Sequence, residues 1–589
     1  MASNPAASPG KYWGQQHVGP IPGIALIHPY LPSGAAKNRE RLRESLALGY
    51  LLGALRSHGF DALAVNAERE ELGPAEVVAR VARHGAPRLV GISVNSQRAY
   101  AAAREVASGL KTNDSSTFIV LGGVFASAAA SEILLECAAI DAVAMGEGEG
   151  IIVDLAHGLV SGAAPETVAG LTVRGADGPF ATAARPRLDD LDLLPPPARP
   201  DLDGADEASL QGASAYVVSS RGCYAACSFC SIHQIYGNRL VRRRSPQNVV
   251  AEITDLVRRY GITRMSFVDD LFVEPSRRGE RWVHEFCDLM IEAGVPVQFY
   301  AEMRADSVTE GLVGHMRQAG LSRVFIGLEA GAPGVLERFN KGTTVADNEA
   351  ALATLRSFFE PNAIEFGYIM FEPDLTIDEL QQQFDYVVGT GLCKTTHLQN
   401  RMNVYWGTPE FDRLRTAGRL AAAPLSERWN YEFTDPRVHQ VERQFRLFQK
   451  AYDAGSGARV SAVRRRLTRT QHRLEDGAEV ERSDLVRQVI KRLNHAERAL
   501  WIAQFRQALA AATGADFAAS EDLEGRLLTD CSWQEALAAQ LEAGLGRWSS
   551  GGGSIALALP GWTIRVKPSF VGFDRYDNSV EVLRSTDAA

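Results

Sequence analysis

The sequence predicts an α/β protein in which a doubly wound N-terminal domain, a βα-barrel domain and a mainly helical C-terminal domain follow one another. Two stretches in which short β-rich runs alternate with helical patterns predict the first two domains. A later stretch rich in Ala, Arg, Leu and Glu, without that alternation, predicts the third. The chain has 589 residues, too many for one hydrophobic core, and the usual domain size gives about three or four domains.

The composition is that of a folded, water-soluble protein. Hydrophobic residues make up 46% and charged residues 23%, and the net charge is −9. A negative balance gives no basic surface for nucleic acid, so nucleic acid is not an expected partner. The first 20 residues have no basic segment followed by an apolar core, so we expect a flexible lead-in and a cytoplasmic protein. No uncharged stretch has the roughly 20 apolar residues of a membrane helix, and no membrane contact is expected.

The N-terminal domain is predicted at residues 21–165, with a sheet of about five strands. Helical spacing of apolar residues at Leu46–His58 and Arg98–Leu110 separates some of the strands. The strand runs are GIALIHP, DALAV, RLVGISV, TFIVLGG and DAVAM. Each run is almost wholly apolar, as in a parallel sheet buried on both faces, which predicts an open doubly wound domain. Ligands of such sheets bind at the carboxyl ends of the strands.

A Pro-rich linker and a second α/β domain follow. Residues 166–210 look irregular and contain Pro195, Pro196, Pro197 and Pro200, which favours a stiff extended connection. Residues 211–405 are predicted to form a partial or complete βα barrel with its chemistry at the strand ends. Its six expected strands are AYVVSS, RMSFVDD, VQFYAEM, RVFIGLE, AIEFGYIM and THLQNRMNVY.

The C-terminal domain is predicted at residues 406–589 and is expected to bind substrate. Its long helical stretches are Val441–Ala454, Ser483–Ala512 and Cys531–Leu545. Three strand-like runs near the end, SIALALP, WTIRVKP and SVEVLR, predict a small β element.

Three cysteines crowd into eight positions directly after the first predicted barrel strand. They are Cys223, Cys227 and Cys230, and the catalytic end of a barrel is where such a loop would lie. Thiolates are soft ligands that suit zinc or an iron–sulfur cluster. A cluster held by three cysteines leaves one iron open for a substrate or cofactor. The alternatives are three structural cysteines, or a zinc site that His233 completes.

The spacing CxxxCx(aromatic)C, with Phe229 in the aromatic position, resembles the signature of the radical S-adenosylmethionine (SAM) superfamily. Further similar segments are FVDDLF, AEMRAD, IGLEAG, NKGTT and YIMFEPD. The resemblance implies a [4Fe-4S] cluster on the three cysteines, SAM at the open iron and an external electron donor. It also implies SAM contacts for Glu302, Arg304 and Glu329.

The N-terminal domain resembles that of the cobalamin-binding, class B radical SAM methyltransferases. The segments VGISVNS, LGGVFAS and MGEGEG carry this likeness and imply a cobalamin site. The cofactor-binding candidates in them are Ser93, Gly122, Gly123, Gly146 and Glu147.

The lower face of the cobalt is expected to differ from the common pattern. Many cobalamin domains supply a histidine from an Asp-x-His-x-x-Gly motif, but around His28 both the Asp and the Gly are missing. Arg69, in the loop after the second strand, is the candidate to lie below the cobalt instead. A cobalt without a strong lower ligand favours polar methyl transfer.

The resemblance implies an enzyme that moves a methyl group from SAM, by way of methylcobalamin, to an unactivated carbon of a small-molecule natural-product intermediate. Length and domain order are most similar to those of the tryptophan 2-C-methyltransferases of thiopeptide biosynthesis, which makes C2 of L-tryptophan and polar transfer the leading expectation. Glu274 is the candidate to reach the open iron and so act in catalysis. The alternatives are radical methylation of an sp3 carbon of another substrate and a cobalamin radical SAM reaction without methylation.

Overall fold

The computed structural model describes most of the chain, in two compact units. The first unit consists of Met1–Gly367 and Asn403–Glu432, and the second of Tyr368–Met402 and Phe433–Ala589. The described residues are 23–30, 44–210, 213–237, 239–454, 464, 467–468, 471, 480–513, 549–551, 554–559, 562–566 and 580–584. The expected flexible N-terminus and the helical prediction at Cys531–Leu545 lie outside these residues.

The N-terminal domain of the first unit is a twisted sheet with the strand order β2-β1-β3-β4-β5-β6-β7. Its first five strands are parallel, as predicted. They are β1 (Ile24–His28), β2 (Leu63–Asn66), β3 (Leu89–Ser93), β4 (Phe118–Gly122) and β5 (Ala142–Ala144). The short helix α2 (Ala67–Glu70) follows β2. All five strands carry their carboxyl ends to one edge, where a doubly wound domain binds ligands.

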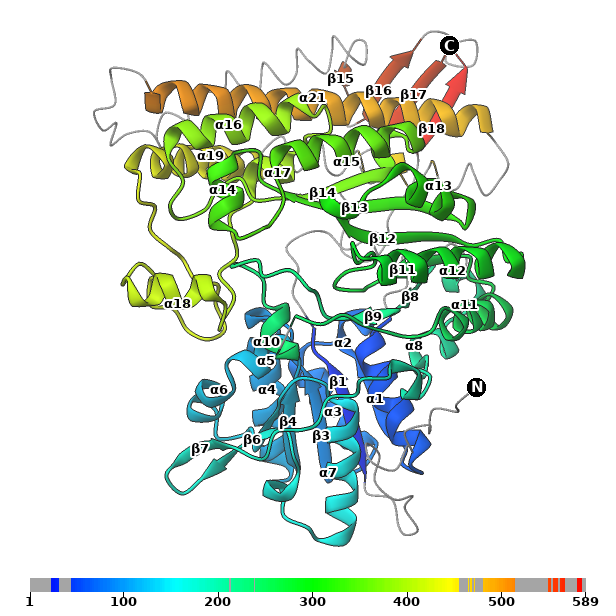
Figure 1. Cartoon of the computed structure of the whole chain (residues 1–589), viewed down its shortest axis with the longest axis vertical. Coiled ribbons are helices and arrows are strands. Elements are labelled where there is room, and N and C mark those ends of the chain that lie inside the picture. Colours follow the sequence, from blue (N-terminus) through cyan, green and yellow to red (C-terminus); the bar gives the residue numbers. More distant parts are fainter. Residues whose placement is uncertain are drawn as a thin grey trace. The chain divides into compact units, whose positions relative to one another are not determined.

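Helices cover both faces of this sheet (Figure 1). Alternate residues of β1 enter two separate cores, since Ile24 and Leu26 pack in one and Ala25 and Ile27 in the other. The first core is closed by α1 (Leu46–Ser57) and α7 (Glu149–Ser161). The second is closed by α3 (Pro74–Arg83), α4 (Gln97–Asn113), α5 (Val124–Ala128) and α6 (Ala130–Glu136). Burial on both faces explains the continuous apolar strand runs.

The segment expected to be irregular, residues 166–210, differs from that prediction in two ways. It contains a hairpin, β6 (Leu171–Gly175) and β7 (Gly178–Ala181), which extends the sheet in antiparallel register from β5. Its proline run also packs closely on α1. A Cβ at Gly49 would lie 2.5 Å from the carbonyl oxygen of Ala198, and one at Gly53 would collide with the carbonyl oxygen of Pro196. The linker is therefore fixed to the first domain.

The second domain of the first unit is an open sheet with the order β14-β13-β12-β11-β8, a partial barrel. Its strands are β8 (Ser214–Val217), β11 (Arg264–Phe267), β12 (Gln298–Arg304), β13 (Leu321–Glu329) and β14 (Ile364–Tyr368). Helices follow the strands: α11 (Pro246–Tyr260), α12 (Arg277–Ala293), α13 (Glu310–Gln318), α14 (Pro333–Arg338) and α15 (Val345–Phe358). The short helices α8 (Pro200–Asp203) and α18 (Pro409–Thr416) belong to the same unit.

The sixth predicted strand, THLQNRMNVY, is reduced to an isolated parallel bridge between Arg401 and Phe371. Its first residues form the short helix α17 (Thr395–Gln399). The backbone N–H of Lys394 donates to Nδ1 of His397 at 3.0 Å, which satisfies a donor at the start of the helix. A local capping interaction therefore decides this segment against its β-like composition.

The second unit contains helices around an aromatic core. The helices are α16 (Ile377–Gly389), α19 (Pro436–Ala454) and α21 (Val480–Thr513). The ring of Phe384 stacks on that of Phe505 with centroids 4.9 Å apart, and Trp501 packs edge-on against Phe445 and Phe448. These helices confirm the predictions at Val441–Ala454 and Ser483–Ala512. No helix in the described ranges, the long α21 included, has an apolar stretch that would cross a membrane.

An antiparallel sheet forms the predicted small β element. Its strand order is β15-β16-β17-β18. The bounds are Ser549–Gly551, Ser554–Leu559, Trp562–Val566 and Val580–Arg584. The last three strands match the runs that the sequence analysis identified.

Candidate functional site

The three clustered cysteines lie on a loop that a short antiparallel ladder closes. Strand β9 (Ser220–Arg221) pairs with β10 (Arg242–Arg243), and the loop between them carries the cysteines and then α10 (Ile232–Tyr236). Gly222 begins the loop with a φ of +94°, and a Cβ there would collide with the carbonyl oxygen of Leu240. Only glycine fits this position without strain.

The thiols of this loop are largely withdrawn from water. Burial raises the pKa of Cys223 and raises the pKa of Cys230 to about 12. The charges of neighbouring cysteines and of Asp270 add to both shifts, while the charge of Arg304 opposes the rise at Cys223. Within the described ranges, no three His, Cys, Asp or Glu side chains are placed so that they would hold a metal ion as they stand. The cluster assignment therefore rests on the cysteine spacing and on the surroundings of the loop.

The NKGTT segment (Asn340–Thr344) and the preceding Phe339 brace the cysteine loop. The side-chain amide of Asn340 donates to the carbonyl oxygen of Ala226 at 2.9 Å. The backbone N–H of Ser228 donates to the carbonyl oxygen of Phe339 at 2.9 Å, and the rings of Phe229 and Phe339 meet edge-on at 5.1 Å. Phe229 thus fills its aromatic position by packing on Phe339, directly before the NKGTT segment.

Arg304, a predicted SAM contact at the end of β12, lies against the cysteine loop. Its Nη1 is 3.7 Å from the sulfur of Cys227, and its guanidinium carbon lies 5.3 Å from the ring centre of Tyr224. Its Nε donates to Asp306 at 3.1 Å, and its Nη2 donates to Asp306 and to the carbonyl oxygen of Lys341. Burial alone would lower the pKa of Arg304, but Asp306 raises it above its ordinary value.

Three carboxylates gather at the carboxyl ends of β11, β12 and β13. They belong to Asp270, Glu302 and Glu329. Burial raises the pKa of Asp270 and of Glu302, and the charges of the other two carboxylates raise that of Glu302 further. The charges of Asp270 and Glu329 both act on Glu302, so these two carboxylates lie near it. Tyr300 donates to Glu302 at 3.0 Å, and Asp270 accepts from the backbone N–H of Gly222 at 2.8 Å.

Glu329 occupies a special position. Its φ of +64° is unusual for a residue with a side chain. The buried ammonium of Lys341 lies 3.0 Å from its carboxylate. Gly327 and Gly367 leave room for this ion pair, because a Cβ at either glycine would come within 3.1 Å of a carboxylate oxygen of Glu329.

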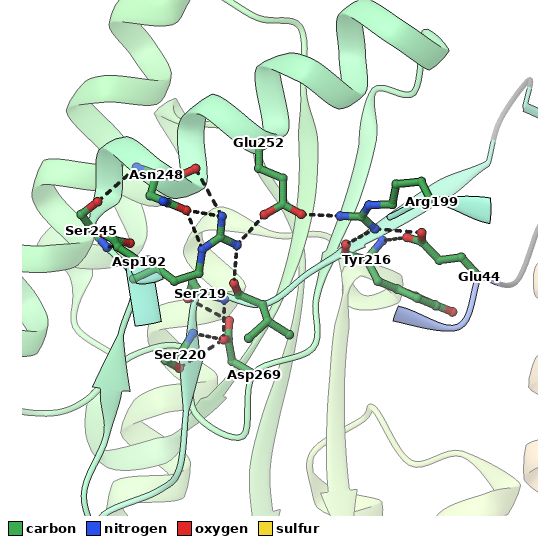
Figure 2. A network of polar contacts seen from close by, with 12 residues as sticks. Glu44, Asp192, Arg199, Tyr216, Ser219, Ser220, Ser245, Asn248, Glu252 and Asp269 are labelled. Atoms are coloured by element: carbon green, nitrogen blue, oxygen red, sulfur yellow. Dashed lines mark hydrogen bonds and ion pairs between the residues drawn. The ribbon is translucent and has the colours of Figure 1, made fainter. Parts of the chain in front are cut away.

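Asp269 fixes the strand end that leads into the loop. Its carboxylate accepts from the backbone N–H and the hydroxyl of Ser219, at 2.8 and 2.9 Å, and from the same two groups of Ser220 (Figure 2). Burial raises the pKa of Asp269 to about 6, although these donors oppose the shift. The first Asp of the FVDD run is therefore a structural acid, whereas the second faces the cysteines.

A buried polar chain joins the linker to the second domain (Figure 2). Arg199 of the linker donates to Glu44 at 2.8 Å and also pairs with Glu252 of α11. Glu252 pairs in turn with Arg244, whose Nη1 donates to the carbonyl oxygen of Val218 at 2.9 Å. Sequence reasoning missed these residues because the partners of Arg199 are 155 and 53 positions away in the chain.

The carboxyl edge of the N-terminal sheet carries the predicted cobalamin residues. Gly123 has a φ of +104°, and a Cβ there would come within 2.5 Å of the side-chain oxygen of Asn95. A Cβ at Gly122 would meet only Ala144, at an ordinary 3.7 Å. Ser93, at the end of β3, accepts a 3.4 Å hydrogen bond from Asn95. Gly123 is thus required by the fold, while Gly122 leaves open surface.

Gly146 and Glu147, also predicted to bind cofactor, contact the second domain. A Cβ at Gly146 would come within 3.2 Å of the carbonyl oxygen of Ile235 in α10. Glu147 pairs with Arg221 at 2.9 Å and with Arg242 at 2.8 Å. Both residues therefore hold the cysteine loop against the carboxyl edge of the N-terminal sheet.

His28 and Arg69 lie at the ends of β1 and β2, close to the linker residue Asp201. Burial lowers the pKa of His28, and its Nδ1 has no hydrogen-bond partner among the residues that the structure describes. Arg69 pairs with Asp201 at 3.4 Å, and Asn66 donates to the same carboxylate at 2.9 Å. The linker thus contributes to the edge where Arg69 was expected to act alone.

Glu274, the predicted catalytic residue, lies in the turn before α12. Its backbone and Cβ pack on Gly279 at the start of that helix, and its charge acts on Arg243. Asp270 is the carboxylate whose charge raises the pKa of Cys223 and Cys230. Asp270 is therefore the carboxylate that acts on the cysteines electrostatically.

Two family models match the chain in separate regions. The B12 binding domain matches residues 36–156, and the Radical SAM superfamily matches residues 217–387. Both matches lie within the domains predicted from the sequence. They confirm the fold class and the predicted cofactors, which are cobalamin, a [4Fe-4S] cluster and SAM.

Curated relatives are similar over both domains. An uncharacterized methyltransferase of Pyrococcus horikoshii is 28% identical over 61% of this chain and 76% of its own length. An anaerobic magnesium-protoporphyrin IX monomethyl ester cyclase of Cereibacter sphaeroides is 30% identical over 56% of this chain and 54% of its own length. The chain thus aligns with only about half of that cyclase.

Solved structures share the fold. The cobalamin-dependent SAM radical enzyme OxsB, with aqua-cobalamin and SAM bound, matches with a TM-score of 0.63 and 16% identity, over 90% of this chain and 85% of that one. The radical SAM methyltransferase TsrM of Kitasatospora setae, with tryptophan and a SAM analogue bound, matches with a TM-score of 0.52 and 17% identity, over 62% and 71%. At 16–17% identity these structures show a shared fold. The two family matches and the methyltransferase relative indicate an enzyme that depends on cobalamin and SAM.

Proposed function

We propose that this chain, which combines a B12-binding domain with a radical SAM domain, is a methyltransferase that moves a methyl group from SAM, by way of cobalamin, to an unactivated carbon of a small molecule. One observation carries the proposal. The cysteine loop of the radical SAM domain is fixed to the carboxyl edge of the cobalamin domain, where Ile235 packs on Gly146 and Arg221 pairs with Glu147. Such an arrangement suits a reaction that needs both cofactors.

The three cysteines of the loop would hold the cluster through their sulfur atoms. Cys223, Cys227 and Cys230 are soft ligands, and three of them leave one iron of a four-iron cluster for SAM. When bound, the cluster, SAM and cobalamin supply the reducing and methyl-carrying chemistry of this class of enzyme. The protein contributes a loop that β9 and β10 close and that the NKGTT segment braces.

The carboxylates beyond the strand ends would bind the polar groups of SAM. The ammonium of SAM is a cation that can pair with a carboxylate, and its ribose hydroxyls can donate hydrogen bonds to one. Asp270, Glu302 and Glu329 are the carboxylates available for these contacts. Lys341 holds Glu329 in place at 3.0 Å, and Tyr300 orients Glu302. A cationic ligand would lower the raised pKa of Glu302, because its charge favours the ionised carboxylate.

The carboxyl edge of the N-terminal sheet would bind cobalamin. Gly122 leaves open surface there, and the hydroxyl of Ser93 lies at the next strand end. Below this edge, His28 and Arg69 share the charge of Asp201. The pairing of Arg69 with Asp201 supports a role in shaping the lower face without cobalt ligation.

For the substrate, the proposal keeps C2 of L-tryptophan with polar transfer as its leading candidate. It rests on the resemblance in length and domain order to the tryptophan 2-C-methyltransferases. The likeness to OxsB covers more of the chain than the likeness to TsrM, so the comparisons do not favour tryptophan over other substrates. In the polar variant Glu274 is the candidate to occupy the open iron, and Asp270 is the carboxylate to compare with it.

The test is an anaerobic incubation of the cluster- and cobalamin-loaded protein with trideuteromethyl-SAM, L-tryptophan and a reductant, followed by mass spectrometry. We expect S-adenosylhomocysteine and trideuteromethyl-tryptophan, with little 5′-deoxyadenosine. Methylated product with equal 5′-deoxyadenosine would replace the polar route by radical methylation. Unchanged tryptophan with S-adenosylhomocysteine and methylated cobalamin would reject tryptophan and keep the methyltransferase.

A second candidate is a cobalamin radical SAM reaction without methyl transfer. Its support is the similarity to the ester cyclase and the structural likeness to OxsB, neither of which is described as a methyltransferase. The same incubation separates the two candidates. A non-methylating enzyme would form 5′-deoxyadenosine but no S-adenosylhomocysteine, whichever substrate is added.

A further inference from the structure

The guanidinium of Arg304 is fixed in a buried position by groups from three different segments. Its Nε–H is directed to Asp306 at 3.1 Å. Its Nη2 donates to Asp306 at 3.1 Å and to the carbonyl oxygen of Lys341 at 2.5 Å. Of the five N–H groups that an arginine carries, these contacts use three, all on one side of the group.

The remaining nitrogen is directed at the cysteine loop. Nη1 lies 3.7 Å from the sulfur of Cys227, a cysteine whose side chain is buried. The ring of Tyr224 covers the guanidinium at 5.3 Å, and its hydroxyl donates to Asp306 at 2.7 Å. Asp306 therefore fixes both the cation and the aromatic ring that covers it.

This arrangement leaves Arg304 little freedom to turn toward a ligand carboxylate. A swing of the side chain would break the ion pair with Asp306 and would leave the carbonyl oxygen of the buried Lys341 without this donor, which is unfavourable. The contact with Cys227, in contrast, needs no movement. Arg304 is therefore better placed to act on a cluster through its cysteine ligand than to bind SAM as a fork.

We propose that Arg304 is a positioning residue that donates a hydrogen bond to the sulfur of Cys227 and thereby raises the reduction potential of the cluster. The inference rests on the proposed function, because it takes Cys227 as a cluster ligand. Reduction adds negative charge to a cluster, and a hydrogen bond or positive charge at a ligand sulfur stabilises that charge. Asp306 and Tyr224 serve this role by holding the guanidinium in place.

The experiment compares reconstituted wild-type protein with the variants Arg304→Gln, Arg304→Lys and Tyr224→Phe, first in the absence of SAM and then, for the spectral change alone, after SAM is added. The control is Arg323→Gln, which removes an arginine of β13 that pairs with Glu365 away from the loop. Iron and sulfide content establish that the cluster is present. An anaerobic redox titration followed by electron paramagnetic resonance then gives the midpoint potential of each protein.

We expect R304Q to lower the midpoint potential by at least the 59 mV that corresponds to a tenfold change in a one-electron equilibrium. R304K keeps the charge but not the fixed geometry, so its potential should lie between those of R304Q and wild type. Y224F should shift the potential in the same direction by less, and R323Q should leave it unchanged. If R304Q fails to retain a cluster, the midpoint potentials of R304K and Y224F, compared with that of wild type, test the inference.

Potentials of R304K and Y224F that match the R323Q control would overturn the inference. So would an unchanged potential in R304Q combined with a weakened spectral change on adding SAM, since that would make Arg304 a SAM ligand. A wild-type protein that takes up no four-iron cluster would instead overturn the proposed function. The two failures are therefore distinguishable from the same samples.

Discussion

Arg221, the last residue before the cysteine loop, donates to Glu147 of the N-terminal domain at 2.9 Å, and both side chains are almost fully buried. Arg221 also pairs with Glu149, and Arg242 on the neighbouring strand shares Glu147. Burial by itself would raise the pKa of Glu147, but the two arginines hold it below its ordinary value. Four charges from two domains thus neutralise one another where the cysteine loop meets the cobalamin domain.

Replacing Arg221 by alanine should destabilise the protein strongly. Glu147 would keep only Arg242 and Glu149 would lose this partner, and breaking a buried pair typically costs about 3–5 kcal/mol. The measurement is the midpoint of urea unfolding together with the iron content after reconstitution. The control is Arg258→Ala, because Arg258 is 79% exposed and its ion pair with Asp255 is worth about 1 kcal/mol at most. Equal effects of R221A and R258A would contradict this account of the domain junction.

The glycines of α1 should not tolerate even one methyl group. In Gly53→Ala the new Cβ would collide with the carbonyl oxygen of Pro196, and overpacking of this kind costs roughly 1–3 kcal/mol. Gly158→Ala is the matched control in α7, where the Cβ would meet only the carbonyl oxygen of Ala163 at 3.6 Å. The free energy of unfolding of this variant should rise by up to about 1 kcal/mol, because alanine has a higher helix propensity than glycine. The midpoint of thermal unfolding should therefore fall in G53A and rise in G158A. Shifts in the same direction would mean that the linker does not pack on α1 in solution.

Asn340 should contribute both through its hydrogen bond and through its backbone conformation. Its φ is +47°, and its amide holds the carbonyl oxygen of Ala226. Asn340→Gly keeps the backbone conformation but loses the hydrogen bond, which should lower the free energy of unfolding by about 0.5–1.5 kcal/mol. Asn340→Ala adds a left-handed strain of roughly 1–2 kcal/mol. Stability and cluster content should fall in the order wild type, N340G, N340A, and the reverse order of the two variants would refute the assignment.

Asp269 should make stability depend on pH. Burial raises its pKa from 3.8 to about 6, so the folded protein binds this proton more tightly than the unfolded chain does. The contribution of the group is then fully present below about pH 4 and is lost as the pH rises through about 6. In urea unfolding, the advantage of wild type over Asp269→Asn should shrink over this interval. The exposed variant Asp255→Asn serves as the control, and an advantage that grows with pH would contradict the assignment.

Much of the fold followed from local patterns. Apolar strand runs separated by helical spacing predicted the five parallel strands of the first domain because both faces of that sheet are buried. The hairpin β6–β7 was missed because its outer strand is short and largely exposed, which leaves no apolar run to detect. The sixth barrel strand is limited to one bridge at Arg401, because a capping contact at Lys394 favours a helix in the residues before it.

The sequence suggests candidate site residues where one segment carries them, and it gives no candidates where distant segments meet. The three cysteines stand in one loop, and the acids Glu302 and Glu329 end adjacent strands. The contact of Arg304 with Cys227, and the use of Glu147 by Arg221, join residues 77 and 74 positions apart. No spacing rule links such pairs. The NKGTT segment was recognised as a motif in the sequence, but its contact with the cysteine loop could not be inferred from it.

The most direct test of the central claim needs no substrate. Protein loaded with the cluster and with cob(I)alamin is mixed anaerobically with trideuteromethyl-SAM for a single turnover, and the cobalamin and nucleoside products are measured by mass spectrometry. The account predicts trideuteromethylcobalamin and S-adenosylhomocysteine in equal amounts. Unmethylated cobalamin, with SAM either intact or converted only to 5′-deoxyadenosine, would contradict it.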